Sequence, residues 1–258
     1  MTATTYPVRD SATMLRRNLL HVRRYPAMTF YLAGMPVIFL LLFVYVFGGT
    51  LGAGLGDGGR AGYLTYVLPG ILLMTVGGAA TGAAVSVATD MTEGIVARFR
   101  TMAIARASVL TGHVLGSMIQ TFVALLIVLG VAVAIGFRSD ASPLAWLGVA
   151  GVLAMVTFAL VWLATALGMV AKTVEEASNS PMPLTLLPFL GSGFVPTDSM
   201  PTGLRQFAEY QPFTPIMESV RALLSGTPVG SNVLVAAAWC AGIALVGYLW
   251  AKRTYNAK

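Results

Sequence analysis

The chain has 258 residues, of which 57% are hydrophobic and only 10% are charged. Soluble domains carry about 25% charged residues, so this composition excludes a soluble protein and predicts an all-α, polytopic membrane protein. The net charge of +6 then reflects basic residues placed beside membrane spans, and not nucleic-acid binding.

Residues 1–26 are polar and basic, and they are predicted to form an amphipathic helix that lies in the membrane interface. Leu15, Leu19 and Val22 fall on one face of this helix. Four arginines would anchor it to anionic lipid headgroups: Arg16, Arg17, Arg23 and Arg24. The alternative is a plain juxtamembrane tail. Pro26 is expected to end the helix before the first span.

Six segments between residues 27 and 251 approach the ~20 apolar residues that a membrane-spanning helix needs. None contains a charged residue, and their ranges are 27–47, 62–89, 114–137, 144–171, 177–197 and 227–251. The fifth is interrupted by Pro181, Pro183 and Pro188, so we expect it to be kinked or to line a translocation route. Residues 252–258 are predicted to be a tail.

Six spans place both ends of the chain on the same side of the membrane. The N-terminal tail, the loops at 90–113 and 172–176 and the C-terminal tail contain 12 of the 16 lysines and arginines. The three segments on the opposite side contain Arg60, Arg138, Arg205 and Arg221. Because basic residues concentrate in cytoplasmic loops, both termini are predicted to be cytoplasmic.

The loop at residues 90–106 is predicted to form one amphipathic helix on the cytoplasmic side. Its apolar arc consists of Ile95, Val96, Phe99, Met102 and Ala103. This pattern indicates a surface for a cytoplasmic partner. The alternative is a solvated loop that only satisfies the membrane topology.

Residues 198–226 precede the sixth span on the outer side, and we call them the outer hairpin. Ile216, Val220, Leu223 and Leu224 repeat at helical spacing, while Pro212 and Pro215 interrupt the middle. This pattern predicts two short helices that meet at a bend and re-enter the outer leaflet. The alternative is an ordinary loop on the outer surface.

The sequence lacks the motifs of an enzyme. It contains no phosphate-binding loop, no zinc-binding H-E-x-x-H and no cluster of potential metal ligands. His21 and His113 are interpreted as interfacial polar residues. Because no ionisable residue lies within a predicted span, the energy for any transport is expected to come from a partner protein.

Two segments resemble type-2 ABC exporter permeases, especially the daunorubicin/doxorubicin resistance branch of actinobacteria. The first resembles their cytoplasmic loop and contains Glu93-Gly94-Ile95, Arg98-Phe99-Arg100, Ile104-Ala105-Arg106 and Gly112. The second resembles their outer hairpin and contains Phe194-Val195-Pro196, Met200-Pro201, Gln211-Pro212, Thr214-Pro215 and Arg221-Ala222-Leu223. The chain departs from the family at Met102-Ala103, where Leu-Pro is usual, at Ala97, where an acid is usual, and at His113, where arginine is frequent.

The resemblance implies a non-catalytic permease subunit in the bacterial plasma membrane, which moves amphipathic drugs, antibiotics or lipid-like molecules out of the cell. A second permease copy, forming a homodimer, and two soluble ABC ATPase subunits are the implied partners, and the ATPase subunits would bind ATP and magnesium. The helix at 90–106 would be the coupling helix, with docking residues Glu93, Gly94, Arg98, Phe99, Arg100 and Arg106. The outer hairpin would act as a gate that contains Phe194, Pro196, Met200, Pro201, Gln211, Pro212, Thr214 and Arg221.

Three alternatives remain open at this stage. The same family includes exporters of lipid-linked glycans. A secondary transporter or channel acting alone would need ion-driven flux and a buried polar site. A membrane scaffold or sensor would keep the cytoplasmic helix as a binding surface without moving a substrate.

Overall fold

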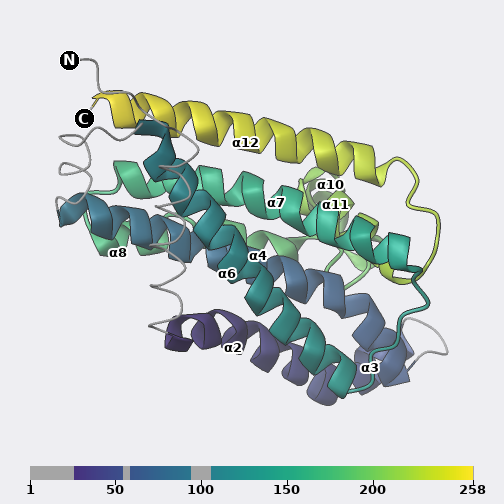
Figure 1. Cartoon of the computed structure of the whole chain (residues 1–258). Helices are drawn as coiled ribbons and strands as arrows, with labels where there is room; N and C mark the ends of the chain where they lie inside the picture. Colours follow the sequence, from purple (N-terminus) through teal and green to yellow (C-terminus); the bar gives the residue numbers. More distant parts are fainter. Residues whose placement is uncertain (1–25, 55–58, 94–105, 258) are drawn as a thin grey trace.

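The computed structural model describes residues 26–54, 59–93 and 106–257, and this part of the chain is helical without any strand (Figure 1). The long helices lie side by side in one bundle. The elements are α2 (Pro26–Leu42), the π-helix η1 (Phe43–Phe47), α3 (Gly48–Ala53), α4 (Gly59–Thr92), α6 (Arg106–Ala134), α7 (Pro143–Val170), α8 (Val174–Asn179), α9 (Met182–Leu186), the 3-10 helices η2 (Leu187–Leu190) and η3 (Thr197–Ser199), α10 (Thr202–Tyr210), α11 (Phe213–Leu224) and α12 (Asn232–Ala257).

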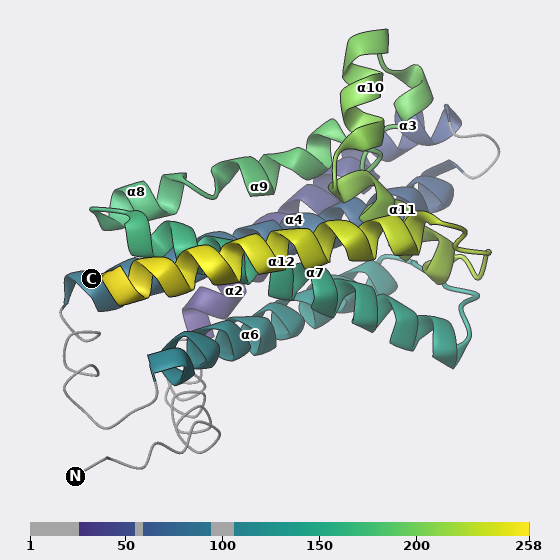
Figure 2. The ribbon, with the colours of Figure 1, turned by 90° about the horizontal axis from the view of Figure 1, so that it is seen from above.

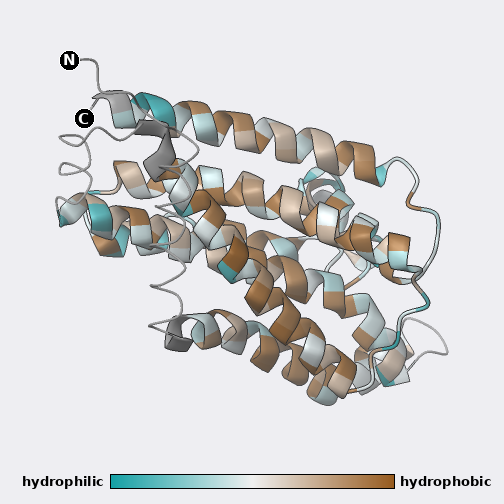
Figure 3. Cartoon of the chain, viewed as in Figure 1, coloured by the Kyte–Doolittle hydropathy of each residue, from teal (hydrophilic) through white to brown (hydrophobic). Residues whose placement is uncertain are grey.

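Five of the predicted spans are confirmed as helices long and apolar enough to cross a membrane. They cover Thr29–Ala53, Gly59–Thr92, Leu110–Ala134, Pro143–Val170 and Asn232–Tyr255. Apolar residues run along these helices, and hydrophilic residues gather near their ends (Figure 3). α12 continues to Ala257, so most of the predicted C-terminal tail extends the last long helix.

The fifth predicted span, at 177–197, is interrupted, as its prolines predicted, and it is not one of the five long apolar helices. These residues form the end of α8, α9, η2 and a series of turns. Pro181, Pro183 and Pro188 cause the breaks, because proline has no backbone N–H and its ring disturbs the preceding helical turn. Figure 2 shows this broken segment running beside the bundle, from the end that carries α8 toward the end that carries α10.

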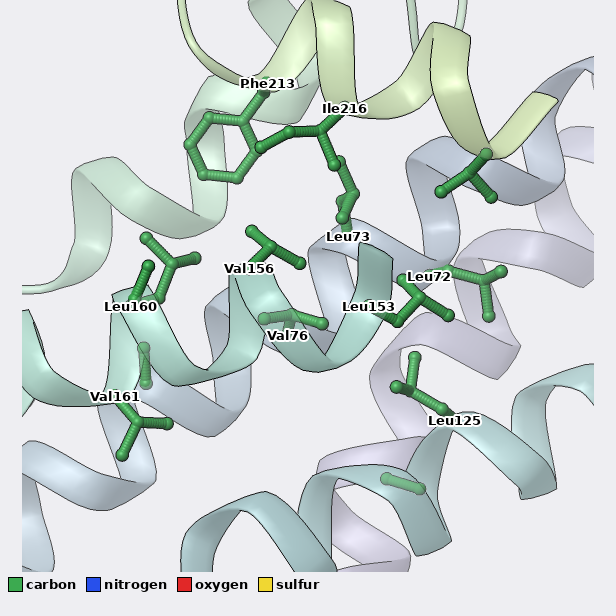
Figure 4. Packing of buried hydrophobic residues seen from close by; sticks show 14 of the residues in the cluster. Leu72, Leu73, Val76, Leu125, Leu153, Val156, Leu160, Val161, Phe213 and Ile216 are labelled. Carbon is green, nitrogen blue, oxygen red and sulfur yellow. The ribbon is translucent and has the colours of Figure 1, made fainter. Parts of the chain in front are cut away.

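α4 is the central helix of the bundle. In its most apolar stretch 72% of the residues are buried, compared with 17% in α12. Figure 4 shows Leu73 and Val76 of α4 packed near Val156 of α7 and Ile216 of α11. Burial of such apolar side chains is a main contribution to the packing of these helices.

Two glycines let the broken segment approach the backbone of α4. A Cβ atom at Gly70 would lie 2.8 Å from the carbonyl oxygen of Gly193, and one at Gly77 would lie 2.9 Å from that of Leu184. Small residues allow such close contacts between helices within membranes. The broken segment therefore lies directly against α4, although it is not a long helix itself.

The outer hairpin has the two short helices that the sequence predicted. α10 and α11 are separated by Gln211 and Pro212. Ile216, Val220 and Leu224 of α11 are buried, as their spacing indicated, whereas α10 buries only Ala208. α11 thus fixes the hairpin to the bundle, and α10 lies at the periphery (Figure 2).

The structure corrects the boundaries of the predicted coupling helix. Residues 90–92 are the last turn of α4, Glu93 follows that helix, and Arg106 begins α6. Residues 94–105 lie outside the described part of the chain, as do residues 1–25 of the predicted interfacial helix.

Candidate functional site

Arg221 joins three separate segments of the chain. Its guanidinium donates hydrogen bonds to the carbonyl oxygens of Ser192 at 2.6 Å and of Tyr66 at 3.2 Å, and to the carboxylate of Glu218 at 2.6 Å. It also lies 4.0 Å from the centre of the Tyr66 ring, within cation–π distance. The Arg221 side chain is only 15% exposed, so these contacts replace most of its hydration.

Pro69 lies inside α4, three residues after Tyr66. An interior proline has no N–H, so the carbonyl oxygen four residues earlier, that of Thr65, lacks its helical donor. The Tyr66 carbonyl oxygen lies next to this break, and because a carbonyl oxygen has two lone pairs, it can accept from Arg221 as well as from the helix.

Gln211 connects the corner of the outer hairpin to the broken segment. Its Nε2 donates to the carbonyl oxygen of Leu187 at 3.1 Å, and the residue is only 5% exposed. Thr214 donates from its hydroxyl to the carbonyl oxygen of Ala208 at 2.5 Å. We call Tyr66, Ser192, Gln211, Thr214 and Arg221 the hairpin junction.

Two buried polar atoms of the hairpin junction, Gln211 Oε1 and Ser192 Oγ, have no hydrogen-bond partner within the described residues. A Cβ atom at the adjacent Gly191 would lie 2.3 Å from Gln211 Nε2. The glycine is therefore needed for the Gln211 side chain to fit. An unpaired buried polar atom costs free energy. The hairpin junction therefore contains two unfavourable groups beside the short hydrogen bonds of Arg221.

Phe194 fastens the segment before the hairpin to α4 and to the first long helix. Its carbonyl oxygen accepts a hydrogen bond from the Tyr63 hydroxyl at 3.2 Å. Its ring stacks on Phe189 with a centroid separation of 4.4 Å, and it lies 4.7 Å from the ring of Phe43 in η1. The aromatic group thus links η1, α4 and the broken segment.

The predicted gate residues therefore divide into two groups. Phe194, Gln211, Thr214 and Arg221 make the contacts described above. The predicted prolines and the methionine lie at the ends of the short helices. The carbonyl oxygen of Pro196 accepts a hydrogen bond from the Ser199 hydroxyl, and Met200 follows η3. Pro201 precedes α10, and Pro212 precedes α11.

The predicted docking residues lie in and beside the connection between α4 and α6. Glu93 is exposed, and its backbone N–H donates to the Thr89 carbonyl oxygen at 2.9 Å. Arg106 is the first residue of α6. Gly94, Arg98, Phe99 and Arg100 lie outside the described residues, as do the predicted lipid anchors Arg16, Arg17, Arg23 and Arg24.

One polar pair was missed by sequence reasoning. Asp90 Oδ2 and His113 Nε2 lie 3.0 Å apart, and both residues are 8% exposed. The sequence interpretation placed Asp90 in the amphipathic helix and treated His113 as an interfacial polar residue. The structure instead buries both between α4 and α6. The only available signal was their position at opposite ends of one charged loop.

Within the described ranges, no group of three or more His, Cys, Asp or Glu side chains lies close enough together to bind a metal ion. The contacts described above are hydrogen bonds, an ion pair and aromatic contacts, and they hold α4, the broken segment and α11 together.

Comparison with known proteins gives one family. The model of the ABC-2 type transporter family matches residues 10–224. The daunorubicin resistance ABC transporter permease protein DrrB1 of Streptomyces coeruleorubidus is 30% identical over 222 residues, which are 85% of this chain and 76% of that protein. The probable doxorubicin resistance ABC transporter permease protein DrrC of Mycobacterium tuberculosis is 28% identical over 221 residues, which are 82% of this chain and 75% of that protein.

Proposed function

Because the chain belongs to the ABC-2 type transporter family and is a permease subunit, we propose that it exports amphipathic drugs, antibiotics or lipid-like molecules across the bacterial plasma membrane. Permease subunits of this family are non-catalytic membrane components. ATP and magnesium are bound by a separate ATPase subunit, whose hydrolysis of ATP supplies the energy. The transporter contains two permease copies and two ATPase subunits.

The observation that carries this proposal is the similarity to a permease named for daunorubicin resistance, which extends over 85% of the chain. The name describes that relative. The proposed substrate class follows from the similarity, and it is consistent with long helices whose residues are mostly apolar.

In this proposal the membrane is crossed six times. Five crossings are the long helices, and the sixth is the broken segment, which runs beside α4 over much of the bundle. Non-helical backbone is tolerated at membrane depth where protein covers it or water fills a cavity. With six crossings and 12 basic residues on one side, both termini and the loop between α4 and α6 face the cytoplasm.

The ATPase subunit docks on the loop between α4 and α6, at Glu93, Gly94, Arg98, Phe99, Arg100 and Arg106. Phe99 supplies an apolar anchor and the arginines supply charge, a combination typical of residues that dominate binding energy. The outer hairpin closes the other end of the pathway. Its link to α4 through Arg221 supports this role, because α4 also leads to the loop between α4 and α6.

Co-purification from the native membrane tests this function. We expect an ATPase with a phosphate-binding loop to co-purify with the wild type, and to be lost with Phe99→Ala and Arg98→Glu. Arg253→Glu reverses an exposed charge of α12, outside the loop between α4 and α6, so this control should retain the ATPase. Well-folded wild-type protein that brings down no ATPase would refute the proposed function.

A further inference from the structure

Asp90 of α4 and His113 of α6 form a buried polar contact between the two helices. Their side chains are 12% and 10% exposed, and Asp90 Oδ2 lies 3.0 Å from His113 Nε2. Neighbouring residues of the same helical turns are apolar and buried, namely Val87, Ala88, Leu110 and Val114. The pair is therefore largely shielded from solvent by its apolar neighbours.

Asp90 and His113 lie at the two ends of the connection between α4 and α6. Asp90 lies in the last turn of α4, and His113 lies two turns into α6. The two residues bracket residues 91–112, which we call the docking loop because they include the proposed ATPase contacts. A contact between Asp90 and His113 thus fixes the distance between the two ends of this loop.

The end of α4 is itself well braced. The Thr89 hydroxyl donates to the Val85 carbonyl oxygen at 2.9 Å, and the Thr92 hydroxyl donates to that of Thr89 at 3.0 Å. The Glu93 N–H also donates to the Thr89 carbonyl oxygen. Asp90 is therefore held on a closed helical turn, and a displacement of His113 would be transmitted to α4 directly.

The contact between Asp90 and His113 depends on direction more strictly than apolar packing does. A buried hydrogen bond is made at one short distance and alignment, and a shift that breaks it costs free energy. Buried polar pairs of this kind can select one register between packed helices.

From these observations we propose that Asp90 and His113 are positioning residues, which hold the stem of the docking loop in the spacing that the ATPase subunit recognises. This inference rests on the proposed function, and it adds two residues that do not touch the ATPase themselves. Movement of the docked ATPase then reaches α4 through His113 and Asp90.

A distance measurement tests the stem without any ATPase. Spin labels are placed at the exposed positions Ser86 of α4 and Leu115 of α6, in full-length protein that carries Cys240→Ala and is held in lipid nanodiscs. We expect Asp90→Asn and His113→Leu to broaden the distance distribution relative to the parent. The exchanged pair, Asp90→His with His113→Asp, should restore it, and Asp140→Asn, which removes an exposed carboxylate between α6 and α7, should not change it.

A binding measurement then tests whether the pair positions the docking loop for the ATPase subunit. The purified ATPase subunit is titrated onto the same nanodiscs, and we expect Asp90→Asn and His113→Leu to raise its Kd about tenfold. The exchanged pair should recover the parent Kd. Asp90→Asn changes the shape of the side chain least, so it provides a folded variant if His113→Leu does not fold.

The two measurements distinguish a failure of the positioning inference from a failure of the proposed function. Unchanged distance distributions in both single variants overturn the inference, and so does an unchanged Kd when the distances do change. A parent protein that binds no ATPase refutes the proposed function instead, and in that case the distance measurement still shows whether the pair holds the stem.

Discussion

The guanidinium of Arg221 donates to the carbonyl oxygen of Tyr66, although 155 positions separate the two residues in the chain. This contact joins the outer hairpin to the central helix. Tyr66 and Asp90 lie in the same helix, 24 residues apart, which corresponds to roughly 36 Å of α-helix. α4 therefore contacts the outer hairpin near one end and α6, through the Asp90–His113 pair, near the other.

We expect Arg221→Lys to destabilise the protein, because lysine cannot reproduce the branched hydrogen bonds to Tyr66 and Ser192. Loss of these charge-assisted bonds should cost about 3 kcal/mol, which lowers the Tm by roughly 6–12 °C. Thermal unfolding of the purified protein in detergent measures the change.

Arg205→Lys is the matched control, since Arg205 is also an arginine of the outer hairpin. Its side chain is 45% exposed and its partners are the exposed Asp198 and Glu209. Exposed ion pairs contribute less than about 1 kcal/mol, so this variant should melt close to the wild type. Equal effects of the two substitutions would show that Arg221 does not hold the hairpin.

We expect Gly70→Ala to disturb the contact between α4 and the broken segment. The added methyl group would lie 2.8 Å from the Gly193 carbonyl oxygen, and backbone atoms cannot move aside cheaply. Overpacking of this kind costs about 1–3 kcal/mol. Circular dichroism during heating should show a lower Tm together with retained helix content at low temperature.

Gly82→Ala gives the comparison for this substitution within the same helix. A Cβ atom there meets nothing within 4 Å, so only the higher helix propensity of alanine acts. The Tm of this variant should equal or exceed that of the wild type. A Gly70→Ala protein as stable as Gly82→Ala would contradict the close approach of the two backbones.

The helix α8, which leads into the broken segment, is capped by Thr173. Its hydroxyl accepts the Glu176 N–H at 3.1 Å, and the Glu176 carboxylate accepts the Lys172 N–H at 2.8 Å. Removing such a cap costs about 1 kcal/mol, so we expect Thr173→Ala to lower the Tm slightly. Thr227→Ala removes an exposed hydroxyl bond at 3.3 Å and should have less effect.

The effect of Thr173→Ala should also depend on pH. Hydrogen bonds from the backbone N–H of Glu175 and from the Thr173 side chain lower the pKa of Glu175 below its ordinary value of 4.5. A lowered folded-state pKa stabilises the protein above that ordinary value, and the contribution is lost as the pH falls through the folded-state pKa. The Tm difference between wild type and variant should therefore be larger at pH 7 than at pH 3, and a constant difference would contradict this assignment.

Sequence periodicity and length predicted the long helices well, because uncharged apolar runs of more than 20 residues have few alternatives to a membrane-spanning helix. The three prolines of residues 177–197 also predicted an interrupted span, because proline removes N–H donors and divides a helix. The division into α8, α9 and η2 is known only from the structure. The short helices can persist because Gly70 and Gly77 let α4 lie against them.

The candidate site was only partly predictable. The resemblance to the family's outer hairpin predicts Arg221 and Gln211 as site residues. Their acceptors, however, are backbone carbonyl oxygens, which no sequence motif identifies: those of Tyr66, Ser192 and Leu187. Asp90 and His113 were overlooked because their contact depends on how α4 and α6 pack. Pairs that form only in the folded bundle cannot be read from local periodicity.

The central claim is that this permease moves its substrate by using ATP hydrolysis in a partner subunit. The most direct test is doxorubicin transport in proteoliposomes that contain the permease and its ATPase, with doxorubicin fluorescence as the signal. We predict accumulation that requires ATP and the ATPase subunit, and that is lost with Arg98→Glu but kept with Arg253→Glu. Transport driven by a proton or sodium gradient in liposomes that contain the permease alone would contradict the account.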